Sequence, residues 1–300
     1  MNNQMKGFLL VFLSAAGFGS MPVLARVAYQ DGANMYELLT ARFVVAWAVL
    51  AVYLWIKKPR RILTKKERGG AILMGLCGYS VASLCFFSAL QRISAPLASI
   101  FLYTYPTFVT GLSALIGMEK MDRVKAGALL ISFLGIFLIL GSSFSSIDIG
   151  GVALAIAAAI LYSAYVLLGN WTLRDAPLTA ATMWISLAAA SGIGGYGFLS
   201  GQLSFQFGMN AWLAIAGLAI FSTVAAIVAF LRGIVLVGAS RASIISTFEP
   251  LITVVLAAVF LSEVLGVVQL LGGFLILASA ILVNRTKKED VKKVATNISI

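Results

Sequence analysis

Glu249 is an acidic residue inside an otherwise apolar stretch, and Pro250 follows it directly in the segment STFEPLITVVLAAVFLSE (246–263). If residues 239–262 form a membrane helix, the carboxylate lies about ten residues, or about 15 Å, from its start, at about 1.5 Å per residue. An unpaired charge at the centre of a bilayer costs about 3 kcal/mol on insertion scales. We therefore expect Glu249 to face a cavity or the protein interior, where it either contacts a substrate or holds helices together.

Arg42 is a basic residue that we expect at nearly the same depth as Glu249, within the second apolar stretch of the chain. An ion pair between the two side chains is the first hypothesis. The guanidinium could instead bind a substrate carboxylate, because its planar fork matches the two carboxylate oxygens. As a third alternative, the long side chain could extend outward to the membrane surface.

Aromatic residues are the third group that could contact a substrate. Several of them are expected near the same depth, where they could line a cavity and stack on a bound molecule. Alternatively, they pack inside the protein, and their polar groups then need hydrogen-bond partners. The candidates are Tyr79, Tyr103, Tyr105, Tyr162, Tyr165 and Trp184.

The apolar content of the chain predicts an all-α integral membrane protein that would position these residues. Of 300 residues, 61% are hydrophobic and 11% are charged, whereas soluble domains carry about 25% charged residues. A spanning helix needs about 20 mostly apolar residues, and the chain contains ten such segments. They cover approximately 5–27, 34–56, 69–91, 96–117, 123–141, 149–170, 178–199, 211–235, 239–262 and 266–284.

Basic residues lie mostly at alternate ends of these ten transmembrane helices. With the N-terminus in the cytoplasm, 18 of the 22 Lys and Arg residues fall at cytoplasmic ends, whereas Arg26 and Arg92 fall at outer ends. Because basic residues are enriched on the cytoplasmic side, we expect a multi-pass protein of the cell membrane with both termini in the cytoplasm. Residues 285–300 form a basic cytoplasmic tail in this scheme. The net charge of +11 is thus explained by topology, and no nucleic-acid partner is expected.

A weak internal repeat relates the two halves of the chain at an offset of 144 residues. It aligns residues 95–119 with residues 239–263, and eight of these 25 positions are identical. We expect a first five-helix repeat at 1–142 and a second at 143–284. Because five is odd, the second copy enters the membrane from the opposite face. Inverted-topology repeats of this kind are found in many secondary transporters, whose substrate sites lie near the midplane between the halves, so we expect a central cavity.

The two charged candidates have no charged counterparts under this offset. Glu249 aligns with Tyr105, and Arg42 aligns with Ser186. The repeat therefore does not require either charge, which makes both residues good candidates for substrate contacts.

Proline, by contrast, is present in both halves at equivalent positions. Pro250 has no N–H and frees the carbonyl of Ser246, and Pro106 does the same to the carbonyl of Leu102. We expect both helices to kink or open there and to shape the cavity. The freed carbonyls need partners from protein or water.

Small residues and a proline also fall together in the first apolar stretch. The segment GFGSMP (17–22) contains Gly17, Gly19 and Pro22. These residues make the first helix a candidate bending element, or they allow close packing against neighbouring helices.

Other charged residues near helix ends have structural interpretations. Glu119 and Glu263 end two equivalent helices at opposite faces, where each is expected to cap the N-terminus of a neighbouring helix. Glu37, at the outer end of the second helix, is expected to be solvated. Arg232, near the inner end of the eighth, is expected to extend to the membrane surface.

Across residues 5–284 the chain resembles the ten-helix EamA-type family of the drug/metabolite transporter superfamily. The resemblance rests on the paired five-helix units, on YPTFVTGLSALIGME (105–119) and EPLITVVLAAVFLSE (249–263), and on SAAGFGSMPVLAR (14–26). It implies export or exchange of small metabolites, often amino acids, through a central cavity. Small four-helix relatives use a Glu in the first helix. Here the first and sixth helices contain no acidic residue, so that mechanism does not carry over.

The leading prediction is a secondary transporter that exports or exchanges a small organic metabolite, an amino acid or a related compound, by alternating access. An uncoupled facilitator of the same fold and a non-transport membrane protein, such as a sensor or an assembly factor, are the alternatives. The chain contains no His and two Cys, and it lacks phosphate loops and zinc-site spacings. We therefore expect no enzyme, metal or cofactor. Proton coupling through Glu249, the substrate and the oligomeric state are left open by the residues.

Overall fold

The computed structural model describes residues 3–58, 61–117, 121, 123–142, 147–173, 176–237, 245–246 and 248–298, and within this part it contains helices joined by loops and no strand. Six helices in this part are long and apolar enough to cross a membrane. They cover Gln4–Gln30, Met35–Lys57, Lys65–Ala89, Ile149–Gly169, Leu178–Leu199 and Met209–Phe230. Two shorter apolar helices cover Phe248–Leu261 and Val267–Leu282. The all-α fold is thus as predicted, whereas the count of ten spanning helices stays a prediction.

The helices of the first predicted half correspond to the expected segments, with two subdivisions. The third segment contains a π-helical turn, and the fourth is broken into two helices. The elements are α1 (Asn3–Gln30), α2 (Met35–Lys57), α3 (Lys65–Leu73), η1 (Met74–Tyr79), α4 (Ser80–Ala89), α5 (Ala95–Leu102), α6 (Tyr105–Leu115) and α7 (Arg123–Ser142).

The second predicted half also contains a π-helical turn, within its third helix. Its last helix continues without a break through most of the predicted tail. The elements are α8 (Ile149–Thr172), α9 (Leu178–Leu199), α10 (Met209–Ala219), η2 (Ile220–Ala225), α11 (Ala226–Val237), α13 (Phe248–Leu261) and α14 (Val267–Ile298).

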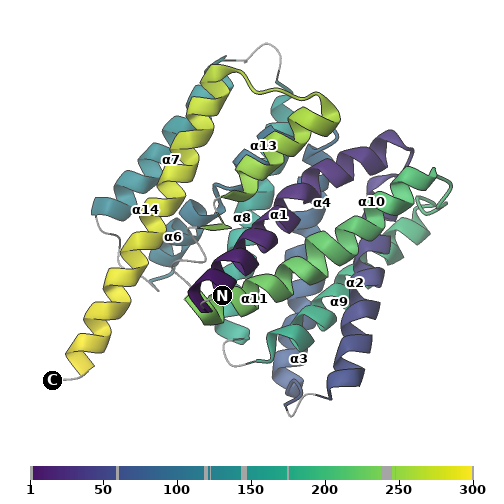
Figure 1. Ribbon diagram of the computed structural model, residues 1–300, viewed down its shortest axis with the longest axis horizontal. Coiled ribbons are helices and arrows are strands. Elements are labelled where there is room, and N and C mark those ends of the chain that lie inside the picture. Colours follow the sequence, from purple (N-terminus) through teal and green to yellow (C-terminus); the bar gives the residue numbers. More distant parts are fainter. Residues whose placement is uncertain are drawn as a thin grey trace.

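The helices that matter for the site are packed around α1 and α8 (Figure 1). Helix α1 contacts α10, α11 and α13, and α8 contacts α4, α5 and α6. At the sides, α2 pairs with α9 and α7 pairs with α14. Each of these pairs joins one helix from each predicted half, so the space between the halves is surrounded by residues that are far apart in the sequence.

Carboxylates at the predicted outer ends cap the first turns of two helices, α8 and α10. The side chain of Asp148 accepts a hydrogen bond from the amide of Gly151 (3.0 Å) in the first turn of α8. The side chain of Asp31 accepts one from the amide of Ala211 (2.9 Å) in the first turn of α10. Such caps satisfy amides that have no partner within the helix and place negative charge at the positive end of the helix dipole.

Glu37 is not solvated, as the sequence suggested, but is 2% exposed. One carboxylate oxygen accepts hydrogen bonds from the amide and hydroxyl of Ser204 and from the amide of Phe205. The other accepts one from the amide of Asn34. The prediction was wrong because the loop between α9 and α10, which is distant in sequence, folds over this carboxylate and provides the donors.

Candidate functional site

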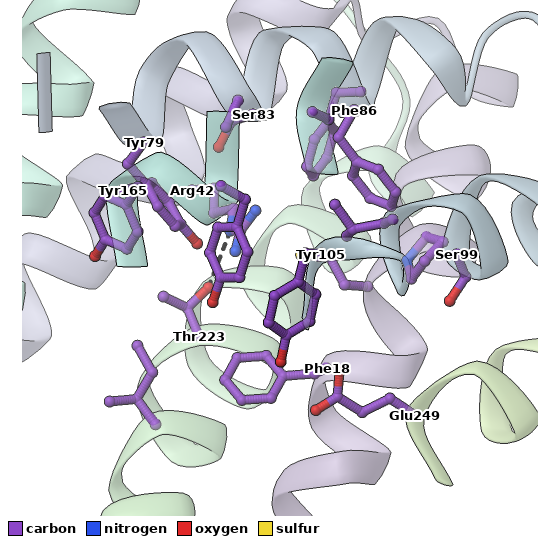
Figure 2. A pocket seen from close by; sticks show the side chains of 18 of the residues that line it. Phe18, Arg42, Tyr79, Ser83, Phe86, Ser99, Tyr105, Tyr165, Thr223 and Glu249 are labelled. Carbon is purple, nitrogen blue, oxygen red and sulfur yellow. Dashed lines mark hydrogen bonds between the residues drawn. The ribbon is translucent and has the colours of Figure 1, made fainter. Parts of the chain in front are cut away.

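A cavity of about 350 Å³ lies between the two predicted halves, and its lining includes both Glu249 and Arg42. Figure 2 shows these two side chains in the same pocket, where they come from different helices. The volume falls within the range of about 300–1,000 Å³ that is typical of small-molecule sites. Aromatic and aliphatic side chains make the lining mostly apolar, and hydroxyl groups add a few polar positions.

Arg42 is held rigidly at this cavity, on α2. Its side chain is 1% exposed, and its Nε donates a hydrogen bond to Oγ1 of Thr223 (3.0 Å) in η2. The guanidinium carbon also lies over the rings of Phe43 (5.2 Å to the centroid) and Phe87 (5.6 Å). The side chain therefore does not extend outward to the membrane surface. Within the described residues, its two terminal nitrogens have no hydrogen-bond acceptor, so they are available to an anionic group.

The expected ion pair between Glu249 and Arg42 is not formed in this structure. The ion pairs in which both partners are described residues include Arg26–Glu263, Arg61–Glu67 and Arg92–Asp148, and none joins Arg42 to Glu249. Arg42 is instead oriented by Thr223 and by two aromatic rings. In the view of Figure 2, Tyr105 and Phe18 lie between the two charged groups. The guanidinium of Arg42 and the carboxyl group of Glu249 thus line one cavity without forming an ion pair.

Five of the six aromatic candidates form a continuous aromatic wall on the cavity lining. Tyr103 contacts Tyr105 (5.8 Å between ring centroids), which contacts Tyr162 (5.0 Å). Tyr162 stacks on Tyr165 (5.7 Å), and Tyr165 contacts Tyr79 (5.4 Å). This wall connects the region of Glu249 to that of Arg42, because Tyr79 in turn contacts Phe43 (5.5 Å).

Trp184 is the aromatic candidate that the structure places elsewhere. It is absent from the cavity lining. The guanidinium of Arg68 lies over its ring at 5.4 Å, and the ring packs against a small cluster that includes Met74. The prediction was wrong because depth along a helix does not specify the face on which a side chain lies.

Both predicted proline breaks border the cavity, and one of them is fully described. Helix α5 ends at Leu102 and α6 begins at Tyr105, with Pro106 as its second residue. In the other half, α13 begins at Phe248, two residues before Pro250. Residues 238–244 and 247 lie outside the described part, so the break before α13 stays a prediction.

The carbonyl that Pro250 frees has a partner from the opposite half. The hydroxyl of Tyr103, at the end of α5, donates a hydrogen bond to the carbonyl oxygen of Ser246. The expectation that this oxygen needs a partner is therefore confirmed. The contact also ties the break between α5 and α6 to the start of α13 beside Glu249.

Gly17 and Gly19 allow α1 to pack closely against the second half. A Cβ atom on Gly19 would lie 2.6 Å from the carbonyl oxygen of Glu249, and one on Gly17 would lie 2.9 Å from Cβ of Ala226. The close-packing interpretation is confirmed. Helix α1 runs without interruption through Pro22, which lines the cavity, so its role as a bending element stays a prediction.

The two π-helical turns are cavity features that the sequence reasoning missed. In η2, Oγ1 of Thr223 donates to the carbonyl of Leu218 (2.7 Å), five residues earlier. At the end of η1, Oγ of Ser80 donates to the carbonyl of Gly75 (2.6 Å), again five residues earlier. The signal in the sequence was a hydroxyl residue inside an apolar helix, and π-bulges of this kind are frequent at functional sites.

The cavity lining reaches the end of the bundle that the charge distribution predicts to be cytoplasmic. Leu178, the first residue of α9, belongs to its lining and is 45% exposed. At the opposite end, the lining residues Phe86 and Phe87 are 3% and 1% exposed. They lie in the last turn of α4 and close the cavity on the predicted outer side.

Comparisons with known proteins agree on the class of the chain. The model of the EamA-like transporter family matches it twice, over residues 5–141 and 149–285. The Uncharacterized transporter YcbK of Bacillus subtilis (strain 168) is 28% identical over 289 residues, covering 89% of this chain and 88% of the relative. The Uncharacterized inner membrane transporter YicL of Salmonella typhimurium is 24% identical over 298 residues, covering 95% and 97%. A solved crystal structure aligns with a TM-score of 0.66 at 17% identity over 93% of this chain and 97% of the other, which shows a shared fold.

Proposed function

The chain belongs to the EamA-like transporter family of membrane proteins, and we propose that it is a secondary transporter that exports or exchanges a small zwitterionic metabolite, an amino acid or a related compound. The observation that carries this proposal is that the Arg42 guanidinium and the Glu249 carboxyl group line one cavity without forming an ion pair with each other. Arg42 would bind the carboxylate of the substrate, and Glu249 would bind its ammonium group.

The unpaired nitrogens of Arg42 are the strongest support for an anionic group in the substrate. Arg42 lines the cavity, so a bound group can reach these nitrogens, and hydrogen bonds between charged groups are stronger than those between neutral ones. Here the hydrogen bond to Thr223 and the rings of Phe43 and Phe87 fix the guanidinium in place. A carboxylate that accepts two hydrogen bonds from its free edge would complete the site.

The aromatic wall supports a substrate with an apolar part. Its rings line the cavity between the two charged groups. A side chain that extends from the zwitterionic group would meet these tyrosine faces, where burial of apolar surface favours binding. The nature of this side chain would then decide which amino acid binds best.

Alternating access is supported by the relation between the two predicted halves. The family model matches the chain once in each half. The contacts of α1 with α11 and α13 correspond, under the offset of 144 residues, to those of α8 with α4 and α6. In an inverted repeat, an exchange of conformations between such halves would close the inner opening and open an outer one. We propose that the protein lies in the cell membrane with both termini in the cytoplasm.

Purified protein in liposomes that are loaded with a panel of amino acids and nucleosides tests this function. We expect exit of at least one amino acid above the rate of protein-free liposomes, and no exit of nucleosides, which lack the carboxylate. Exit of no compound in the panel, with protein that binds none of them, would contradict the proposal and favour a non-transport role. Exit that needs no ion gradient would favour the uncoupled facilitator.

A further inference from the structure

A polar cluster lies beyond the closed end of the cavity, where α4 ends and α5 begins. We call it the outer cluster; its side chains are Arg26 on α1 and Glu263 in the loop between α13 and α14. Nε and Nη2 of Arg26 donate to Oε1 of Glu263 at 3.1 Å and 2.6 Å. Nη1 of Arg26 donates to the carbonyl of Leu90 at 2.9 Å. Oε2 of Glu263 accepts from the amide of Ala95 at 2.8 Å.

The contact with Ala95 confirms that Glu263 caps a neighbouring helix, because Ala95 is the first residue of α5. Its two oxygens have separate partners, one on α5 and one on α1. Its counterpart Glu119 lies outside the described residues. Both partners belong to the first predicted half, so this carboxylate links the second half to two separate helices of the first.

The outer cluster is joined to the residues that close the cavity. Leu90 follows directly after α4, whose last turn contributes Phe86 and Phe87 to the closed end. On α1, one turn beyond Arg26, the hydroxyl of Tyr29 donates to the carbonyl of Phe87 (3.1 Å). Arg26 and Tyr29 therefore hold the end of α4 against α1, and Glu263 holds the start of α5 against the second half.

A second outer ion pair provides a natural comparison. Arg92 and Asp148 are 3.6 Å apart with side chains that are 53% and 41% exposed. The side chains of Arg26 and Glu263 are 27% and 16% exposed. The outer cluster has the shorter and more buried pair, and it adds two hydrogen bonds to main-chain groups at the end of α4 and the start of α5.

We propose that Arg26 and Glu263 form the outer latch of the transport cycle. The pair holds the cavity closed on the outer side in the conformation seen here, and it separates when the cavity opens to that side. Both residues are positioning residues, because neither contacts the cavity. Partly exposed ion pairs give modest stabilisation, so this latch biases the conformational equilibrium without preventing the opening that alternating access requires.

Thiol labelling tests the latch on the full-length protein in native membrane vesicles. In a background with Cys77→Ser and Cys85→Ser, the cavity residue Ser83 is changed to Cys as a reporter. A membrane-impermeant maleimide is applied to right-side-out and to inside-out vesicles. We expect Glu263→Gln and Arg26→Gln to raise the labelling rate from the outer side roughly fivefold, which corresponds to about 1 kcal/mol, and to lower it from the inner side.

Asp148→Asn is the matched control, because it removes the other outer ion pair and keeps a side chain that can cap α8. We expect its labelling rates to equal those of the reporter background. The double variant with Arg26→Gln and Glu263→Gln should resemble either single variant, since the two side chains act as one contact. Arg26→Lys, which keeps the charge but loses the fork, should give an intermediate rate.

The latch is wrong if Glu263→Gln and Arg26→Gln leave the outer rate unchanged. It is also wrong if the rates rise equally from both sides, because that result would indicate general loosening of the fold. The inference rests on the proposed alternating-access transport, but the labelling needs no substrate. Failure of the liposome panel would therefore leave the sidedness result intact, and failure of the latch would leave the substrate result intact.

Discussion

The helices α6 and α13 occupy equivalent places in the two predicted halves, but they present different groups to the cavity. Pro106 is the second residue of α6, and Pro250 is the third residue of α13. The residue before the proline is Tyr105 in one half and Glu249 in the other, and both line the cavity. The prolines serve the shape that both halves share, whereas the side chains beside them give the two walls different chemistry.

The same contrast recurs on the facing helices. Arg42 aligns with Ser186 and Thr223 aligns with Tyr79, and all four residues line the cavity. Arg42 and Thr223 form a hydrogen-bonded pair. Their counterparts, Ser186 and Tyr79, are both uncharged. Charge is therefore concentrated where the repeat is broken, which is where a substrate with ends of opposite charge would be bound.

The largest difference is expected between Arg42→Gln and Ser186→Ala. Loss of the guanidinium removes the partner of the substrate carboxylate, and truncation of a buried charge pair costs about 2–5 kcal/mol. We therefore expect amino-acid exit from liposomes to fall about 100-fold or more in Arg42→Gln. Exit by Ser186→Ala should stay within about threefold of the wild type, which corresponds to less than 1 kcal/mol.

Arg232→Gln is the control for loss of an arginine from a membrane helix. Its side chain is exposed and absent from the cavity lining, as expected for a side chain that extends to the membrane surface. We expect wild-type exit. Equal losses of amino-acid exit in Arg42→Gln and Ser186→Ala would contradict a special role of the guanidinium in substrate binding.

A smaller effect is expected from the pair Glu249→Gln and Tyr105→Phe under an imposed pH gradient. If Glu249 carries a proton during the cycle, the gradient changes the initial exit rate of the wild type, and Tyr105→Phe keeps this response. The glutamine in Glu249→Gln cannot change its charge. We therefore expect substrate to leave liposomes with this variant about tenfold more slowly, at a rate that does not depend on the pH gradient. A response that persists in Glu249→Gln would place the coupling group elsewhere.

The smallest effect is expected where α1 and α8 approach the two breaks. Gly19 contacts the carbonyl of Glu249 without a side chain, whereas Ser163, its counterpart, donates a hydrogen bond to the carbonyl of Tyr105 (3.0 Å). Gly19→Ala introduces a Cβ at 2.6 Å from that oxygen and should destabilise the protein by about 1–3 kcal/mol. Ser163→Ala loses one interhelical hydrogen bond, which is worth about 0.6 kcal/mol in membrane proteins.

Thermal unfolding in detergent measures this last difference. The midpoint for Gly19→Ala should lie clearly below that for Ser163→Ala. The reverse order would show that the hydroxyl, and not the close approach, maintains the contacts between α1 or α8 and the neighbouring breaks.

Residue chemistry predicted the features of the fold that follow from one side chain or from local pattern. Pro106 interrupts the helical hydrogen bonds before it because it lacks an N–H, and α5 and α6 are separate as expected. The carbonyl of Ser246 has a partner, and Glu263 caps a helix, because unsatisfied main-chain groups attract donors or acceptors wherever these are available. None of these predictions required knowledge of which helices are neighbours.

The predictions that failed depended on neighbours that the sequence does not specify. Arg42 was expected to pair with Glu249 because both lie at similar depth, but depth leaves the distance across the bundle undetermined. Trp184 was placed in the cavity for the same reason and faces Arg68 instead. Glu37 was expected to be solvated, and this failed because Ser204, in the loop that covers it, lies 167 residues away in the sequence.

The central claim is that one substrate bridges Arg42 and Glu249, and paired substrate analogues test it most directly. The amino acid that the panel identifies, its carboxamide and its N-acetyl derivative are each tested for inhibition of the exit of the labelled amino acid. The measurement is made with the wild type, Arg42→Gln and Glu249→Gln. We predict that the wild type rejects both derivatives, that Arg42→Gln no longer distinguishes the amino acid from its carboxamide, and that Glu249→Gln no longer distinguishes it from the N-acetyl form. Wild-type discrimination against both derivatives in both variants would contradict the claim.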